Sequence, residues 1–111
     1  MIAPKVMAAR RRARAEWWRA AGAALERRAA AGSPGASRML AAWREAEIAS
    51  VKEIARLMVC GKTDISRRWA ALGLPTPPGG AAVRVTDLPT EPPDPGAVEK
   101  VQRQRWRQSG R

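Results

Sequence analysis

Few side chains of this sequence are of the types that catalyse reactions or hold metals. The chain has one cysteine, Cys60, and no histidine among its 111 residues. A Ser–His or Cys–His nucleophile pair is therefore impossible, and a zinc site, which takes mainly Cys and His ligands, is not expected. Asp64, Asp87 and Asp94 lie in different local contexts, and the sequence has no glycine-rich phosphate loop. We expect neither an enzyme nor a bound cofactor or metal.

The single cysteine and the distribution of apolar residues also bear on the compartment. Cys60 excludes an internal disulfide and fits a reducing cytoplasm. It falls on an apolar position of a helical pattern, so a small buried hydrophobic residue is its expected role. The sequence contains no run of about eighteen apolar residues, which a membrane-spanning helix would require. We expect a cytoplasmic protein with no membrane association.

Positive charge is the dominant chemical property of the chain. Its 21 Lys and Arg residues against 10 Asp and Glu give a net charge of +11. The charge is densest in residues 1–31, where eight basic minus two acidic side chains give +6. Such a balance predicts a polyanionic partner, nucleic acid before an anionic membrane surface. A basic N-terminal arm would add sequence-independent affinity through counterion release.

Helices must position these charges, and the clearest helical signals lie in residues 50–75. Ser50 followed three residues later by Glu53 is the pattern of a capping box, which satisfies backbone N–H groups at a helix start. Apolar residues at helical spacing follow. This helix should end near Cys60 and Gly61, because glycine tolerates turn conformations that other residues resist.

A second, basic helix is predicted directly after this turn. Lys62 begins it, and Thr63 or Asp64 is expected to cap it. Its apolar stripe has the spacing i, i+4, i+7, and a glycine and a proline end it; these residues are Ile65, Trp69, Leu72, Gly73 and Pro75. Since only a few residues separate the two helices, they must cross steeply and share a core with a third helix.

The segment IARLMVCGKTDISRRWAALGLP resembles the helix-turn-helix of the resolvase-like and homeodomain-like bacterial or phage DNA-binding families. The resemblance covers residues 50–75. Ala55 matches the small residue at which the two helices touch, and the apolar core positions are matched by Met58, Cys60, Ile65 and Trp69. One position departs from the family pattern. Val59 replaces the usual turn glycine, and the glycine comes two residues later, at Gly61.

The resemblance implies that the helix near residues 62–72 docks in the major groove of double-stranded DNA. Its base-facing side chains would be Lys62, Thr63, Ser66 and Arg67. Lysine and arginine suit guanine O6 and N7, and Ser or Thr can serve several bases. Phosphate contacts, which fix register without reading sequence, would come from Lys52, Arg56 and Arg68, and in the N-terminal arm from Arg10, Arg11, Arg12 and Arg14. The alternative for all of these residues is a solvated helix surface.

The expected fold class is all-α: a small helical bundle with a central helix-turn-helix, a basic N-terminal helix and a Pro-rich C-terminal extension. Composition divides the chain into four regions. They are a basic N-terminal helix or arm over 1–31, a three-helix domain over 37–75, a Pro/Gly-rich linker over 76–96 and a basic tail with a possible short helix over 97–111.

Three further details are expected inside these regions. Ser37 is a plausible cap for a helix that runs to Ala49, and Trp43 on that helix is expected to pack near Trp69. Residues 83–85 are the only strand-like alternation and could form a minimal wing, although no partner strand is evident.

Two functions stay open at this point. The first is a sequence-reading DNA-binding protein, either a transcriptional regulator or a phage-type accessory factor. The second is an interaction or assembly protein that uses the same fold to bind a protein partner or to form a homo-oligomer, as a phage packaging adaptor or a small inhibitor does. Both imply the cytoplasm of a bacterium or of a phage-infected cell.

Overall fold

The computed structural model describes residues 3–89, and the expected helix within 97–111 and the residues of the linker beyond 89 lie outside this range. Four α-helices follow one another in the order α1 (Pro4–Ala30), α2 (Pro34–Glu45), α3 (Val51–Met58) and α4 (Lys62–Ala71). A 3-10 turn, η1 (Val85–Asp87), comes last. The described part is a compact all-α domain, as predicted.

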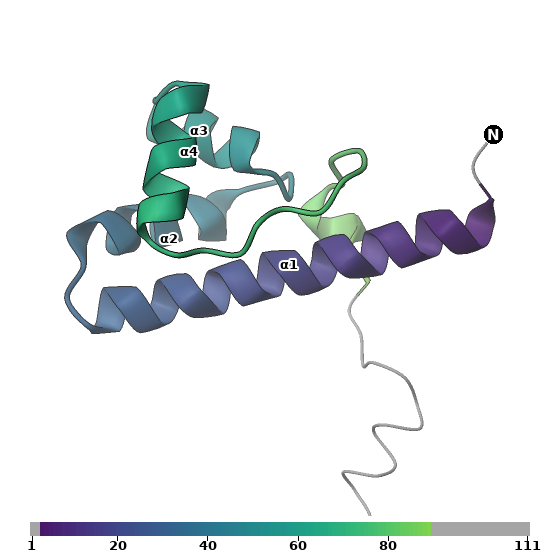
Figure 1. Ribbon diagram of the computed structural model, residues 1–111, viewed down its shortest axis with the longest axis horizontal. Coiled ribbons are helices and arrows are strands. Elements are labelled where there is room, and N and C mark those ends of the chain that lie inside the picture. Colours follow the sequence, from purple (N-terminus) through teal and green to yellow (C-terminus); the bar gives the residue numbers. More distant parts are fainter. Residues whose placement is uncertain (1–2, 90–111) are drawn as a thin grey trace, which may run out of the picture.

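Helix α1 is the long axis on which the other helices are built (Figure 1). The helices α2, α3 and α4 lie beside its C-terminal half, and its N-terminal half extends beyond them. Residues 3–13 are exposed on every side, whereas burial begins at residue 14. The buried face of α1 combines bulky and very small side chains: Ala15, Trp17, Trp18, Ala21, Gly22, Ala24 and Leu25.

Helix α2 packs against α1 through a tryptophan that needs a glycine opposite it. The Trp43 ring stacks on Trp18 with centroids 5.6 Å apart, and its indole N–H donates to the Trp18 carbonyl at 3.1 Å. A Cβ at Gly22 would lie 2.3 Å from this ring, so only glycine fits there. The prediction that Trp43 packs near Trp69 is wrong, because Trp43 stacks on Trp18 of α1 whereas the ring partner of Trp69 is Trp17.

The start of α2 also differs from the prediction. The helix begins at Pro34, with the Ser33 hydroxyl accepting from the Ala36 N–H at 3.2 Å, and it ends at Glu45 rather than Ala49. Proline is well suited to the first position of a helix, and serine before it is a strong cap. Ser37 lies inside the helix, where its hydroxyl donates to the Ser33 carbonyl.

The strand-like residues 83–85 have a partner that the sequence did not reveal. An isolated antiparallel bridge joins Ile48 to Arg84. The Ala49 N–H donates to the Val83 carbonyl and the Val85 N–H donates to the Glu47 carbonyl, both at 2.8 Å. These bonds attach the segment after α4 to the connection between α2 and α3, so residues 83–85 do not project as a wing.

The close approach of Gly22 and Trp43 predicts that Gly22→Ala destabilises the fold. Alanine normally stabilises a helix interior by about 1 kcal/mol relative to glycine. Here we expect a net loss of about 1–3 kcal/mol, since the added methyl group forces the Trp43 ring out of its place. Thermal unfolding followed by tryptophan fluorescence measures this.

Gly35→Ala in α2 is the matched control, because a Cβ there meets nothing within 4 Å. We expect this variant to be as stable as the wild type or more stable. A Gly22→Ala variant that gained stability to the same degree would contradict the close approach of the two helices.

Candidate nucleic-acid interface

The helices α3 and α4 form a pair joined by three residues, Val59–Gly61. Two of the three residues of the predicted apolar stripe of α4 are confirmed as core: Ile65 and Trp69 are 2% and 5% exposed. The third, Leu72, is the C-cap that follows the helix and is partly buried against the core. Ala55, where the two helices were expected to touch, is also buried. The inward side of α4 is therefore fully used by packing.

The exposed part of α4 carries the four side chains that the sequence assigned to base contact: Thr63 and Arg67 point away from the buried stripe, and Lys62 and Ser66 lie beside it, one turn before Ile65 and Trp69. Lys62, Thr63, Ser66 and Arg67 are all exposed. The one acidic residue of this helix, Asp64, forms an ion pair with Arg68 one turn later, with the two side-chain atoms 3.1 Å apart. Helix α4 thus presents an outward surface of hydroxyl, ammonium and guanidinium groups.

The C-terminal end of α4 is held against α1 by two tryptophans that share one acceptor. The indole N–H groups of Trp17 and Trp69 donate to the Pro75 carbonyl at 2.9 and 2.8 Å. The two ring centroids lie 5.7 Å apart. Gly73, with a φ of 64°, turns the chain so that Leu74 becomes buried and its N–H donates to the Trp69 carbonyl. These contacts fix the position of α4 relative to α1.

The turn before α4 contains a strained residue. Val59 has φ 54° and ψ 53°, and its side chain is 90% exposed. The Val59 and Cys60 N–H groups donate to the Arg56 and Ala55 carbonyls, which closes the end of α3 in the manner usual for a C-terminal glycine. The left-handed turn is therefore at Val59, the position at which the sequence resemblance led us to expect glycine. Gly61 instead is the N-cap of α4, and neither Thr63 nor Asp64 caps this helix.

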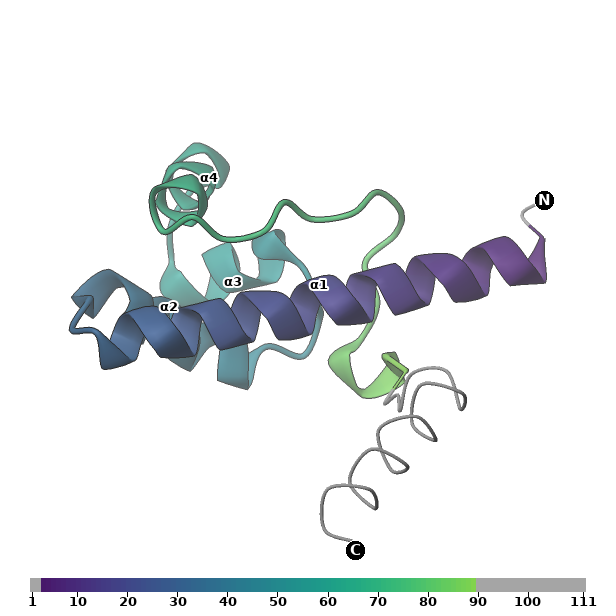
Figure 2. The same cartoon turned by 60° about the horizontal axis from the view of Figure 1, so that its bottom comes forward.

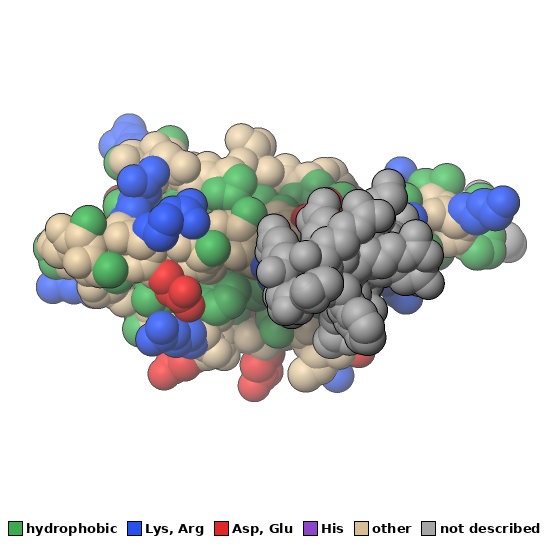
Figure 3. Space-filling view, turned by 90° about the horizontal axis from the view of Figure 1, so that it is seen from below, with side chains coloured by type: hydrophobic (Ala, Val, Ile, Leu, Met, Phe, Trp, Pro, Cys, Tyr) green, Lys and Arg blue, Asp and Glu red, His purple; other side chains and the backbone are tan. Residues whose placement is uncertain are grey.

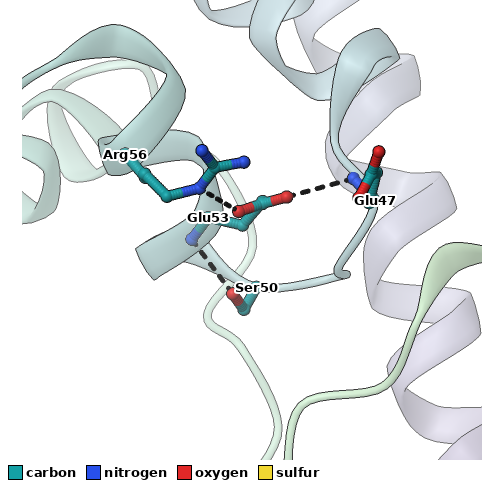
Figure 4. A network of polar contacts seen from close by, with 4 residues as sticks. All are labelled: Glu47, Ser50, Glu53 and Arg56. Atoms are coloured by element: carbon teal, nitrogen blue, oxygen red, sulfur yellow. Dashed lines mark hydrogen bonds and ion pairs between the residues drawn. The ribbon is translucent and has the colours of Figure 1, made fainter.

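The start of α3 is held by a polar network around Glu53 (Figure 4). The Ser50 hydroxyl accepts from the Glu53 N–H at 3.1 Å, which is one half of the predicted capping box. The Glu53 carboxylate does not return to the Ser50 N–H, which donates to the Ile48 carbonyl. It accepts instead from Arg56 Nε at 2.8 Å and from the Glu47 N–H at 3.2 Å.

This network sets the charge of Glu53 although its side chain is only 5% exposed. The hydrogen bond from Arg56 is the largest cause that lowers the pKa of Glu53; burial opposes it, and the Glu47 N–H lowers the pKa further. The same hydrogen bond raises the pKa of Arg56. Arg56 therefore serves α3 itself, and its guanidinium is still largely exposed.

Arg14 has a different place from the other arginines assigned to the arm. It is 6% exposed, and its guanidinium donates to the Ala49 carbonyl at 2.7 Å and to the Pro78 carbonyl at 3.0 Å. It also lies 5.3 Å from the centre of the Trp17 ring, and burial lowers the pKa of Arg14. Arg14 is thus not available to a phosphate, which corrects the expectation for this residue. Arg10, Arg11 and Arg12 are exposed, as is Lys52 on α3.

Two other classes of site were sought in the described part of the chain. Between residues 3 and 89, no three side chains of His, Cys, Asp or Glu come together in a way that could hold a metal ion. None of the helices described in this range is both long and apolar enough to cross a membrane.

The pKa of Glu53 predicts how stability depends on pH. Since this pKa is lower in the folded than in the unfolded protein, its stabilising effect is present above the ordinary carboxylate pKa of about 4.3 and is lost as pH falls through the lower folded value. We expect Glu53→Gln to unfold at a lower temperature than the wild type at neutral pH, and this difference to shrink on acidification to about pH 3. A difference that stayed constant from pH 7 to about pH 3 would contradict the role of the charge.

The strained turn predicts a stabilising substitution. Val59→Gly should raise the free energy of unfolding by about 0.5–1 kcal/mol, because glycine adopts the left-handed conformation without the steric cost of a Cβ, although it loses more entropy on folding. Denaturant unfolding measures this. Val59→Ala, which keeps a Cβ, should change the stability less, and equal effects of the two variants would argue against strain at this residue.

The described residues form a small all-helical domain of four helices. Comparison of the chain with models of protein families, with curated proteins and with solved structures finds no match.

Proposed function

We propose that this protein binds double-stranded DNA and reads its sequence, with α3 and α4 acting as a helix-turn-helix and α4 lying in the major groove. One observation carries the proposal. Packing of Ile65 and Trp69 into the core leaves the remaining, cationic and hydroxyl-bearing surface of α4 open to solvent. Guanine acceptors in the major groove pair with arginine and lysine, and Ser or Thr hydroxyls accept from or donate to several bases.

Further basic residues in this proposal serve as phosphate contacts. Lys52 and Arg56 lie on α3, and Arg10, Arg11 and Arg12 lie on the projecting half of α1. Such contacts are independent of sequence and set the register of a protein on the duplex. The net charge of +11 favours association of the protein with DNA, which is a polyanion.

The way α4 is held supports base reading over mere electrostatic adhesion. Hydrogen bonds to base edges require side chains that start from a fixed backbone, since a loosely held helix cannot keep them in a directional geometry. Here a closed turn fixes α4 before Lys62, and the Pro75 carbonyl with its two indole donors fixes it after Trp69. A transcriptional regulator or a phage-type accessory factor would need this arrangement.

The proposal predicts unequal effects of removing exposed charges. After selection of a preferred duplex from random sequences, Lys62→Ala and Arg67→Ala should each weaken its binding by about 1–3 kcal/mol, the range expected for one good hydrogen-bonded pairing with a base. Preference for the selected duplex over a scrambled one should fall as well. Fluorescence anisotropy with labelled duplexes measures both quantities.

Arg38→Ala is the control, because this exposed α2 arginine lies outside the helix pair and its replacement removes the same charge. If both α4 variants bind the selected duplex as the control does, docking of α4 is wrong. If the wild type shifts no duplex even at low salt and light scattering finds a large oligomer, an assembly protein becomes the better description.

The role of the basic arm on the projecting half of α1 is tested by the salt dependence of DNA binding. Replacing Arg10, Arg11 and Arg12 together by alanine should reduce the slope of log K against log salt by about 0.9 for each phosphate that the arm no longer neutralises. The ratio of affinities for selected and scrambled duplexes should stay unchanged, because phosphate contacts carry no sequence information. A changed preference with an unchanged slope would place the arm in a base-reading role.

A further inference from the structure

A second basic surface lies at the C-terminal end of α4, and the sequence-based prediction assigned no DNA contact to it. An open groove of about 670 Å³ lies between the last turn of α1, the start of α2 and the end of α4. Arg27 and Arg28 contribute its charged side chains, and the remainder is lined by Leu72 and by small residues, among them Ser33, Ala70 and Gly73. The space-filling view shows several basic side chains over this end of the molecule, with acidic side chains beside some of them (Figure 3).

The charge of this groove is not neutralised by neighbouring acids. Within residues 3–89, neither Arg27 nor Arg28 belongs to an ion pair. Glu26, their neighbour in sequence, is paired across to Arg44 on α2 with the two atoms 3.8 Å apart. No acidic side chain is among the described residues that line the groove. Two adjacent, exposed arginine side chains therefore line the groove beside residues that carry no charge.

The position of Arg28 relative to α4 is specific. A Cβ on Gly73 would lie 2.9 Å from Arg28 Nη2, so the guanidinium lies directly over the residue that ends α4. Gly73 needs its left-handed conformation to close that helix, and its missing side chain also leaves the room that Arg28 occupies. The guanidinium is thus positioned at the edge of the same helix that carries the base-facing residues.

We propose that Arg27 and Arg28 bind the phosphate backbone of the duplex that α4 reads, at the end of α4 opposite Lys62. A helix in the major groove is bordered by phosphates, so cations held at its end meet the backbone rather than the bases. Arginine binds phosphate oxygens with two parallel N–H donors. This inference rests on the proposed function and adds an anchor that fixes how far along the groove α4 lies.

The test compares three variants that each remove one positive charge: Arg27→Ala, Arg28→Ala and the α2 control Arg38→Ala. Binding of the selected duplex is measured between about 50 and about 200 mM salt by fluorescence anisotropy. We expect the slope of log K against log salt to fall by about 0.9 for Arg27→Ala and for Arg28→Ala and to stay unchanged for the control. Preference for the selected over the scrambled duplex should be kept in all three.

A second variant at position 28 separates the loss of charge from a disturbed fold, because Arg28 also lies close to the end of α4. Arg28→Lys keeps the charge, so it should keep the salt slope while weakening binding, since lysine lacks the two-donor geometry. Equal slopes for the wild type, Arg27→Ala and Arg28→Ala would overturn the inference. If Lys62→Ala and Arg67→Ala still weaken binding in that case, the proposed function stands without it; if the wild type binds no duplex, the proposed function itself fails.

Discussion

The sharing of one carbonyl by two tryptophans is the interaction on which the arrangement of this domain depends. Trp17 belongs to α1, Trp69 to α4, and Pro75 to the segment that leaves α4; their two N–H···O bonds meet at one oxygen. A carbonyl oxygen has two lone pairs and can satisfy both donors, so neither indole N–H is buried without a partner. The Pro75 carbonyl thus fixes three segments at one point and joins the end of α4 directly to α1.

Tryptophan has this role because the chain offers no other aromatic residue. With no Phe and no Tyr, the bulk of the core comes from Trp17, Trp18, Trp43 and Trp69. Such large rings need small neighbours to reach native packing density. Alanine and glycine supply them along α1, and Gly22 under Trp43 is the tightest example. The alanine-rich composition of the helices is therefore complementary to the tryptophans rather than merely favourable for helix formation.

The sequence predicted best what is decided over a few residues. The two helices after Ser50, the burial of Ile65 and Trp69 and the end of α4 at Gly73 all follow from local spacing and from glycine chemistry. The position of the left-handed turn was not predicted correctly. Glycine is the residue that favours this conformation, so Gly61 was expected to adopt it, but Val59 adopts it instead. Local propensity is overridden there by the need to close α3 and start α4 within three residues.

Pairings between distant residues could not be predicted from sequence patterns. Arg14 looks like its neighbours Arg10 to Arg12 in sequence, yet its acceptors are carbonyls of residues 49 and 78, which only the folded chain brings near. For the candidate interface, the exposed residues of α4 could be predicted, since they are the complement of its apolar stripe. Arg27 and Arg28 could not, because their relation to α4 arises from tertiary packing.

The continuity of α1 changes what the basic N-terminal residues can do. A disordered arm would search for phosphates over a wide volume and would lose conformational entropy on binding. Here Arg10, Arg11 and Arg12 belong to the same 27-residue helix as Trp17, and at 1.5 Å per residue they lie roughly 10 Å beyond it along that helix. Figure 2 shows α1 passing uninterrupted from the part beside the other helices to the projecting N-terminal part, with α4 seen almost end-on at the edge of the molecule. The Trp17 indole N–H donates to the same Pro75 carbonyl as Trp69 of α4, so the arm and the base-facing helix have a fixed relative direction. In the proposed complex, phosphates bound by the arm would therefore be set at a defined distance from the bases read by α4, so the arm would contribute to the register of the protein on the duplex as well as to its affinity.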